Sequence, residues 1–145
     1  MKIERKFTES KDYGDKRNKR DIEYIVIQTI DNKPITHYQV RDDNAIQYIP
    51  DEFLSNSVNG ARLSTKGVFH GICTKYNSIS IGLPSKPSTD EIQTCIKLIM
   101  TIKQRYKVKN EKVIRLTDIT GEPNPERWYD NDRWHKDIIS NLIEL

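Results

Sequence analysis

Short runs of β-branched and apolar residues alternate along this chain with one long amphipathic stretch, and this alternation limits the possible folds most strongly. Residues 22–30 form a short apolar run, which is typical of a strand buried at the centre of a sheet. Residues 79–83 and 113–116 are two further apolar runs of strand length. Residues 38–50 read as a hairpin, because the Asp and Asn residues at 42–44 tolerate the geometry of a tight turn.

The clearest helical signal begins at Ser88. Glu91 follows three residues later, which is the spacing of a capping box. Apolar residues then recur every three or four positions and make one stripe: Ile92, Cys95, Ile96, Ile99, Ile102 and Tyr106. A last helix is expected from about Asp132. Strands that alternate with helices predict an α/β fold, with a mixed central β-sheet flanked by helices.

The length and composition of the chain indicate one domain. The 145 residues suffice for a hydrophobic core, which we place in a single domain at residues 21–145. Residues 1–20 are rich in Lys and Arg interrupted by acidic residues, and we expect them to form a solvated N-terminal arm. No apolar run is long enough for a transmembrane span, and the N-terminus lacks a signal peptide. We therefore expect a cytoplasmic protein without a membrane partner.

Four segments carry a more specific signal through their order. Residues 24–32 read Tyr-Ile-Val-Ile-Gln-Thr-Ile-Asp-Asn, and His37-Tyr38 follows. Residues 69–82 contain Asn-Ser-Ile-Ser-Ile-Gly, and residues 112–125 contain Asp-Ile-Thr-Gly-Glu-Pro-Asn-Pro. Together they resemble the zinc-dependent N-acetylmuramoyl-L-alanine amidases of phages and bacteria, which cut peptidoglycan. The resemblance covers roughly residues 20–140 and implies an amidase-like fold, similar to that of peptidoglycan-recognition proteins.

The residues that would hold zinc in this family are replaced here. The resemblance puts Gln28 and Leu116 where the family has ligand histidines, and Asn124 where it has Cys or Asp. Gly82 stands in place of a glutamate that acts as general base in part of the family, and Glu122 in place of a lysine that stabilises the oxyanion. Amides and an aliphatic side chain cannot hold a hydrolytic zinc. The sequence therefore predicts a degenerate member that is not an enzyme and has no metal or cofactor.

The cleft that the resemblance implies keeps a polar lining. The ligand-binding residues expected there are Gln28, Thr36, His37, Arg62, Asn77, Ser80, Arg115, Thr117, Asn124 and Trp128, with Lys66 and Lys75 reaching in from loops. Amides suit the edge of a heterocyclic base, and Arg or Lys binds phosphate. Trp128, Tyr129, Tyr76 and Tyr38 are candidates to stack on a ring. The three histidines show no ligand spacing and are expected to be ordinary hydrogen-bonded residues.

Three functional hypotheses stay open. The first is a phage-encoded, catalytically inactive sponge that sequesters an immune signalling nucleotide, because degenerate amidase-like proteins are implicated in blocking cyclic-pyrimidine-nucleotide (Pycsar) defence. Its partner would be a small anionic ligand such as cUMP or cCMP, in the host cytoplasm, with assembly into a homo-oligomer and no polymeric nucleic acid. The second is a pseudo-amidase that binds peptidoglycan fragments. The third is an active enzyme with a non-standard site, although no catalytic triad is legible in the sequence.

Overall fold

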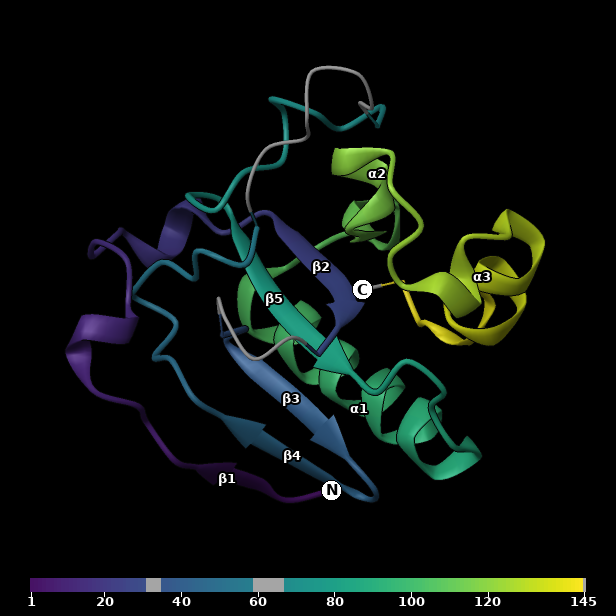
Figure 1. Ribbon diagram of the computed structural model, residues 1–145, viewed down its shortest axis with the longest axis horizontal. Coiled ribbons are helices and arrows are strands. Elements are labelled where there is room, and N and C mark those ends of the chain that lie inside the picture. Colours follow the sequence, from purple (N-terminus) through teal and green to yellow (C-terminus); the bar gives the residue numbers. More distant parts are fainter. Residues whose placement is uncertain (31–34, 59–66, 145) are drawn as a thin grey trace.

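The computed structural model describes residues 1–30, 35–58 and 67–144. Within these ranges, six strands form one mixed sheet, and α1 lies across one of its faces (Figure 1). The strands are β1 (Ile3–Arg5), β2 (Tyr24–Thr29), β3 (Tyr38–Arg41), β4 (Asn44–Gln47), β5 (Ser78–Leu83) and β6 (Val113–Arg115). The α-helices are α1 (Thr89–Tyr106), α2 (Thr117–Thr120) and α3 (Asn131–Asp137). The predicted α/β fold with a mixed central sheet is confirmed.

The direction of the strands decides where a site can form. In the order β1-β4-β3-β5-β2-β6, β2 runs parallel to both β5 and β6, and β3 runs parallel to β5. These four strands therefore end at the same edge of the sheet, which we call the carboxyl edge, and begin at the opposite one, the amino edge. Open parallel sheets commonly bind ligands at their carboxyl edge.

Both faces of β2 are covered, which explains its uninterrupted apolar sequence. Ile25 and Ile27 belong to the main core cluster together with the buried stripe of α1. Tyr24 and Val26 point to the other face, where they pack in a smaller cluster with Ile114 of β6. Side chains of a strand alternate between faces, so Gln28 continues the second set at the carboxyl edge.

Helix α1 begins with the predicted capping box. The Ser88 hydroxyl accepts a hydrogen bond from the Glu91 N–H at 3.1 Å, and the Glu91 carboxylate accepts one from the Ser88 N–H at 3.0 Å. The helix ends at Tyr106, and Lys107 follows in a left-handed conformation with φ of 56°. None of the helices that the structure describes is long and apolar enough to cross a membrane.

The N-terminal segment contacts the sheet at several points. Strand β1 pairs in parallel with β4, which itself forms the predicted hairpin with β3. Arg17 then inserts its half-buried guanidinium between loops, donating to the carbonyl oxygens of Asp51 at 3.0 Å and of Ser78 at 2.6 Å. These bonds join the first twenty residues to the amino edge of the sheet.

Candidate functional site

The carboxyl edge brings together the three residues that the sequence aligns with metal ligands. The N–H of Leu116 donates to the Ile27 carbonyl oxygen at 2.9 Å, so the residue after β6 lies beside β2. Asn124 returns to the same place, because its Oδ1 accepts from the N–H of Thr29 and its carbonyl oxygen accepts from the N–H of Thr117, both at 2.8 Å. Gln28 immediately precedes Thr29. The predicted convergence of Gln28, Leu116, Thr117 and Asn124 is thus what the geometry shows.

Gln28 has an unusual environment for an amide. Only 4% of the residue is exposed, yet its Oε1 has no hydrogen-bond partner in the part of the chain that the structure describes. A buried acceptor left unpaired destabilises a fold by about 1–3 kcal/mol. Such a group is either satisfied by a bound molecule or retained at a cost, so Gln28 marks this edge as a place where a ligand N–H or O–H would be stabilised.

These donors do not fit the zinc ion of the family that the sequence resembles. Asn124 Oδ1 already accepts the Thr29 N–H, Gln28 offers a neutral amide, and Leu116 has no donor atom. Zinc sites use imidazole, thiolate or carboxylate ligands. In the described ranges, no group of three or more His, Cys, Asp or Glu side chains is placed to hold a metal. We therefore assign no step to a zinc ion at these three positions.

Gly82 pairs with Gln28 across β2 and β5, and its surroundings are closed. A Cβ added there would lie 3.0 Å from the Ile30 side chain and 3.1 Å from the Thr36 hydroxyl. Thr36 is itself buried and donates to the Tyr38 carbonyl oxygen at 2.7 Å. The space into which a side chain at residue 82 would extend is occupied by its neighbours.

His37, which directly precedes β3, and Ser80 in the middle of β5 form a buried polar network. The Ser80 N–H donates to His37 Nδ1 at 3.1 Å, and His37 Nε2 lies 2.8 Å from the Phe53 carbonyl oxygen. An Nδ1 that accepts and an Nε2 that donates define one neutral tautomer. Burial, with the nearby Arg17 charge as a second cause, lowers the pKa of His37 to about 4.

This pair has the residue types of a nucleophile and its base, with the Ser80 Oγ 3.2 Å from His37 Nδ1. It is not arranged for catalysis. Ser80 is fully buried, its Oγ accepts from the His37 N–H and from the Ser57 hydroxyl, and the Nδ1 lone pair is already occupied. His37 and Ser80 are both hydrogen-bonded within the fold.

Three predicted ligand-binding residues are not shown to face this edge. Asn77 precedes β5 at the amino edge, about 16 Å from Gly82 at roughly 3.3 Å per residue, and its side chain closes a turn with Thr74. Arg115 is buried and holds Asp118 through two hydrogen bonds of 2.8 and 3.1 Å, so its guanidinium is structural. Arg62 and Lys66 lie outside the described residues.

Trp128 was predicted to face the cleft, and this placement is wrong. The residue is fully buried, its ring packs on Trp134, and its indole N–H donates to the Asp137 carboxylate at 2.9 Å. A tryptophan at this spacing from a C-terminal helix stabilises the core under α3 instead of stacking on a ligand. The next residue, Tyr129, is 54% exposed.

A pocket that the sequence did not predict adjoins the carboxyl edge. It has a volume of about 510 Å³ and lies between the segment after β5 and the start of α3. Its lining includes Lys86, Arg127, Arg133 and the exposed Tyr129. Because these cations come from separate segments, local sequence patterns did not connect them. The pairing of β5 with β2 and the Thr29–Asn124 bond bring the two segments together.

Comparison with known proteins identifies the fold. No protein-family model matches the chain, and no curated protein sequence matches it. Among solved structures it is similar to PlyL, with a TM-score of 0.75 and 18% identity over 100% of this chain and 99% of that one. It is similar to the catalytic domain of XlyA, with a TM-score of 0.75 and 15% identity over 99% and 100%. It also matches N-acetylmuramoyl-L-alanine amidase LysC from Clostridium intestinale URNW, with a TM-score of 0.65 and 12% identity over 99% of each chain.

The predicted amidase-like fold is therefore confirmed, and one further prediction is corrected. The sequence predicts that the chain is not an enzyme, but the chain matches a catalytic domain and an N-acetylmuramoyl-L-alanine amidase along their whole length. That prediction is wrong because it rested on side chains at a few positions. Their replacement concerns zinc binding there and does not establish that activity is lost.

Proposed function

We propose that this amidase-fold protein binds a small anionic ligand carrying an aromatic ring, and that the ligand is a cyclic mononucleotide such as cUMP or cCMP. The protein would hold the nucleotide at the carboxyl edge and lower its free concentration, as a sponge does. One observation supports the proposal above all: the pocket of about 510 Å³ after β5 combines cationic side chains with an exposed tyrosine. A volume of roughly 300–1,000 Å³ suits a ligand of this size.

The electrostatics of the pocket favour an anion. Lys86 and Arg133 have no ion-pair partner among the residues that the structure describes, whereas Arg127 lies 3.4 Å from Asp137. Asp130 also lines the pocket, but its Oδ1 already accepts the N–H groups of residues 132 and 133 as the N-cap of α3. A phosphate there meets two unpaired cations and two acids, of which Asp130 is engaged as the N-cap and Glu126 is exposed to solvent.

The neutral groups suit a nucleobase. The Tyr129 ring is more than half exposed and offers a face for stacking. Asn124 is partly exposed and lies two residues before Glu126, which lines the same pocket. An amide carries both donors and acceptors, as the edge of a pyrimidine does. Cation, aromatic ring and amide together match phosphate, base face and base edge.

The test is isothermal titration calorimetry with cUMP and cCMP, followed by chromatography of the ligand after the protein is denatured. We expect binding, recovery of the nucleotide unchanged, and at least about tenfold weaker binding in the Lys86→Ala/Arg133→Ala double variant, since a charged hydrogen bond contributes roughly 1.5–3 kcal/mol. Lys136→Ala, an exposed charge change on α3 outside the pocket, is the matched control. Absence of binding, conversion of the nucleotide, or an equal loss in the control would refute the proposal.

Amide hydrolysis in peptidoglycan is a second candidate, and the fold match to an N-acetylmuramoyl-L-alanine amidase favours it. The site would be the same edge, where Gln28 Oε1 has no hydrogen-bond donor among the described residues and would accept a substrate N–H. Purified peptidoglycan and muropeptides should then release new amino termini, detected by mass spectrometry, and Gln28→Ala should slow that release. If micromolar protein releases no new amino termini over a day, peptidoglycan hydrolysis is excluded. That result does not bear on nucleotide binding, which calorimetry tests separately.

A further inference from the structure

A second pocket lies at the opposite end of the sheet, where α1 stops. Strand alternation places Arg5 and Phe7 on the face of the sheet that α1 covers, and Arg5 pairs with Gln47 of β4. The chain continues this pairing beyond β1, since the N–H groups of residues 6 and 8 donate to the carbonyl oxygens of Gln47 and Tyr48. Because α1 ends at Tyr106, it leaves this part of the sheet uncovered, and a pocket of about 400 Å³ remains.

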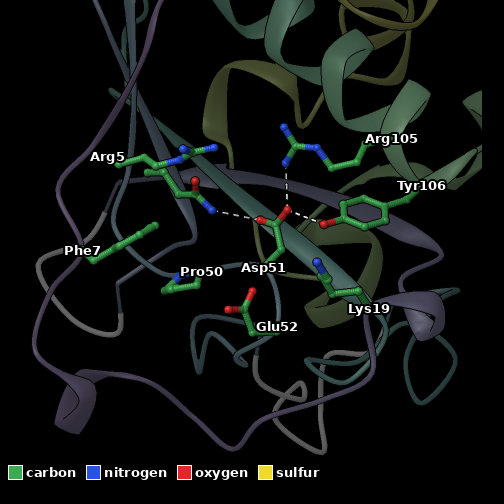
Figure 2. Close-up of a pocket in the computed structure, with 9 residues that line it drawn as sticks. Arg5, Phe7, Lys19, Pro50, Asp51, Glu52, Arg105 and Tyr106 are labelled. Carbon is green, nitrogen blue, oxygen red and sulfur yellow. Dashed lines mark hydrogen bonds and ion pairs between the residues drawn. The ribbon is translucent and has the colours of Figure 1, made fainter.

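The floor of the pocket is a fixed hydrogen-bonded hub (Figure 2). The buried Asp51 carboxylate accepts from the Tyr38 hydroxyl at 2.8 Å, from the Gln47 amide at 3.1 Å and from Arg105 Nη1 at 2.8 Å. The Tyr106 hydroxyl donates to the same carboxylate. Asp51 therefore neutralises Arg105 and holds Arg105 and Tyr106 in place as one wall, with little conformational entropy left to lose when a ligand binds.

The remaining charges of this region are strongly unbalanced. Arg5 and Lys19 line the pocket, and Lys19 also lines an adjoining hollow with Arg20 and Lys107. None of these four cations has an ion-pair partner in the described ranges, and Glu52 is the acid that faces them once Asp51 is paired. Four unpaired cations against one carboxylate give an excess of three charges, equal to the formal net charge of +3 of the whole chain.

The arrangement also includes an exposed aromatic side chain. Phe7 is 47% exposed, although it lies within the paired N-terminal segment and is large enough to be buried. In Figure 2, Phe7 and Tyr106 lie on opposite sides of Asp51, and Lys19 lies on the side of Tyr106. A ligand that spans this pocket meets Phe7 and Arg5 on one side of Asp51 and Lys19 on the other.

We propose that this pocket is a second binding site, for a nucleoside polyphosphate. Its phosphate groups would lie against Lys19 and Arg5, with Arg105 as a further donor, and its base against Phe7. The last turn of α1 carries partial negative charge, but Lys107 at that end offsets it. A chain of phosphates suits this site better than a single phosphate, because the free cations are spread over two adjoining hollows.

The test is isothermal titration calorimetry of the full chain with ATP, tripolyphosphate and orthophosphate at low salt. We expect ATP and tripolyphosphate to bind and orthophosphate to bind at least about tenfold more weakly, since it can contact fewer cations. Arg5→Ala/Lys19→Ala should weaken both ligands by about tenfold or more. Phe7→Leu should weaken ATP by about fivefold, because stacking on the base is lost, and leave tripolyphosphate unchanged.

Two controls separate this site from the carboxyl edge. Lys6→Ala removes a charge from the opposite face of the same segment and should have no effect, because Lys6 already pairs with Glu4 at 3.5 Å. Lys86→Ala/Arg133→Ala should also leave ATP binding unchanged. This variant therefore tests the pocket at the end of α1 independently of the proposed nucleotide site at the carboxyl edge. No heat from tripolyphosphate, an equal loss in either control, or a much tighter complex with a single-stranded oligonucleotide would overturn the proposal.

Discussion

Acidification should destabilise this fold through one buried residue, His37. Its Nδ1 accepts the Ser80 N–H at 3.1 Å, so a proton on Nδ1 would set two donors against each other. Burial, and then the charge of Arg17, lowers the pKa of His37 to about 4. In the unfolded chain the ring has a pKa of about 6.5, so the unfolded state binds the proton more tightly.

The sign and size follow from linkage. Because the folded pKa is depressed, the neutral ring contributes full stability above pH 6.5 and loses it as pH falls toward 4. The difference between a pKa of about 6.5 in the unfolded chain and about 4 in the fold corresponds to roughly 3 kcal/mol, and about 2 kcal/mol of that is lost between pH 7 and pH 5. For a domain of this length that loss lowers the melting temperature by about 4–8 °C.

The assay is urea unfolding at pH 7 and pH 5, for the wild type and for His37→Gln, which cannot titrate. Carboxylates titrate in both proteins, so the difference between their two pH dependences isolates the histidine, and we expect that difference to be about 2 kcal/mol. NMR of the imidazole ring should also show one neutral tautomer with the proton on Nε2. Equal pH dependences, or a ring that titrates near pH 6.5, would refute the reasoning.

Three further changes test other parts of the structure. Asp51→Asn should lower the free energy of unfolding, measured in urea, by about 2 kcal/mol. The substitution removes the countercharge of Arg105, whose guanidinium is partly exposed. Gly82→Glu should destabilise by about 1–3 kcal/mol, since a Cβ there lies 3.0 and 3.1 Å from neighbouring side chains; an unchanged melting temperature would show that the site can open. The triple variant Gln28→His/Leu116→His/Asn124→Cys places zinc-ligand side chains at the carboxyl edge. Mass spectrometry should show one bound zinc ion for this variant and none for the wild type.

The sequence predicted those helices and strands that are determined by residues close together in the chain. The capping box at Ser88 and Glu91 formed as expected, because both partners are fixed by a spacing of three. The central strand was predicted at residues 22–30 and is found at Tyr24–Thr29, since burial on both faces leaves a continuous apolar run. Strand β1 was not predicted, because its three residues gain their conformation only by pairing with β4.

Residues of the carboxyl edge were predicted through the family resemblance, not through their chemistry. Gln28 and Asn124 lie far apart in the sequence, and nothing in their local pattern says that they meet beside Thr29. The sequence also does not show whether a side chain is already hydrogen-bonded to another residue inside the fold. Arg115 and Trp128 have the side chains that a nucleotide site needs, but Asp118 and Asp137 engage them inside the structure.

The two pockets could not be predicted from the sequence for the same reason. Their cations are drawn from segments that are distant in sequence, and the exposed lysines and arginines of a chain in which 31% of residues are charged do not stand out individually. Lys86 and Arg133 line one hollow and Arg5 and Lys19 line the other, and none of the four has a paired acid among the described residues. Unpaired like charges that face one hollow repel each other, and a bound anion relieves that repulsion.

The unpaired Oε1 of Gln28 also indicates a bound ligand at the carboxyl edge. At a buried position within β2, an aliphatic residue would avoid the unpaired Oε1 and its cost of about 1–3 kcal/mol. Gly82 adds no side chain that could donate to it across the strand pair, and the Asn124 Oδ1 is itself an acceptor, already bonded to Thr29. The donor that completes Gln28 must therefore come from outside the described part of this edge, and a ligand N–H is the kind of group that both candidate functions supply.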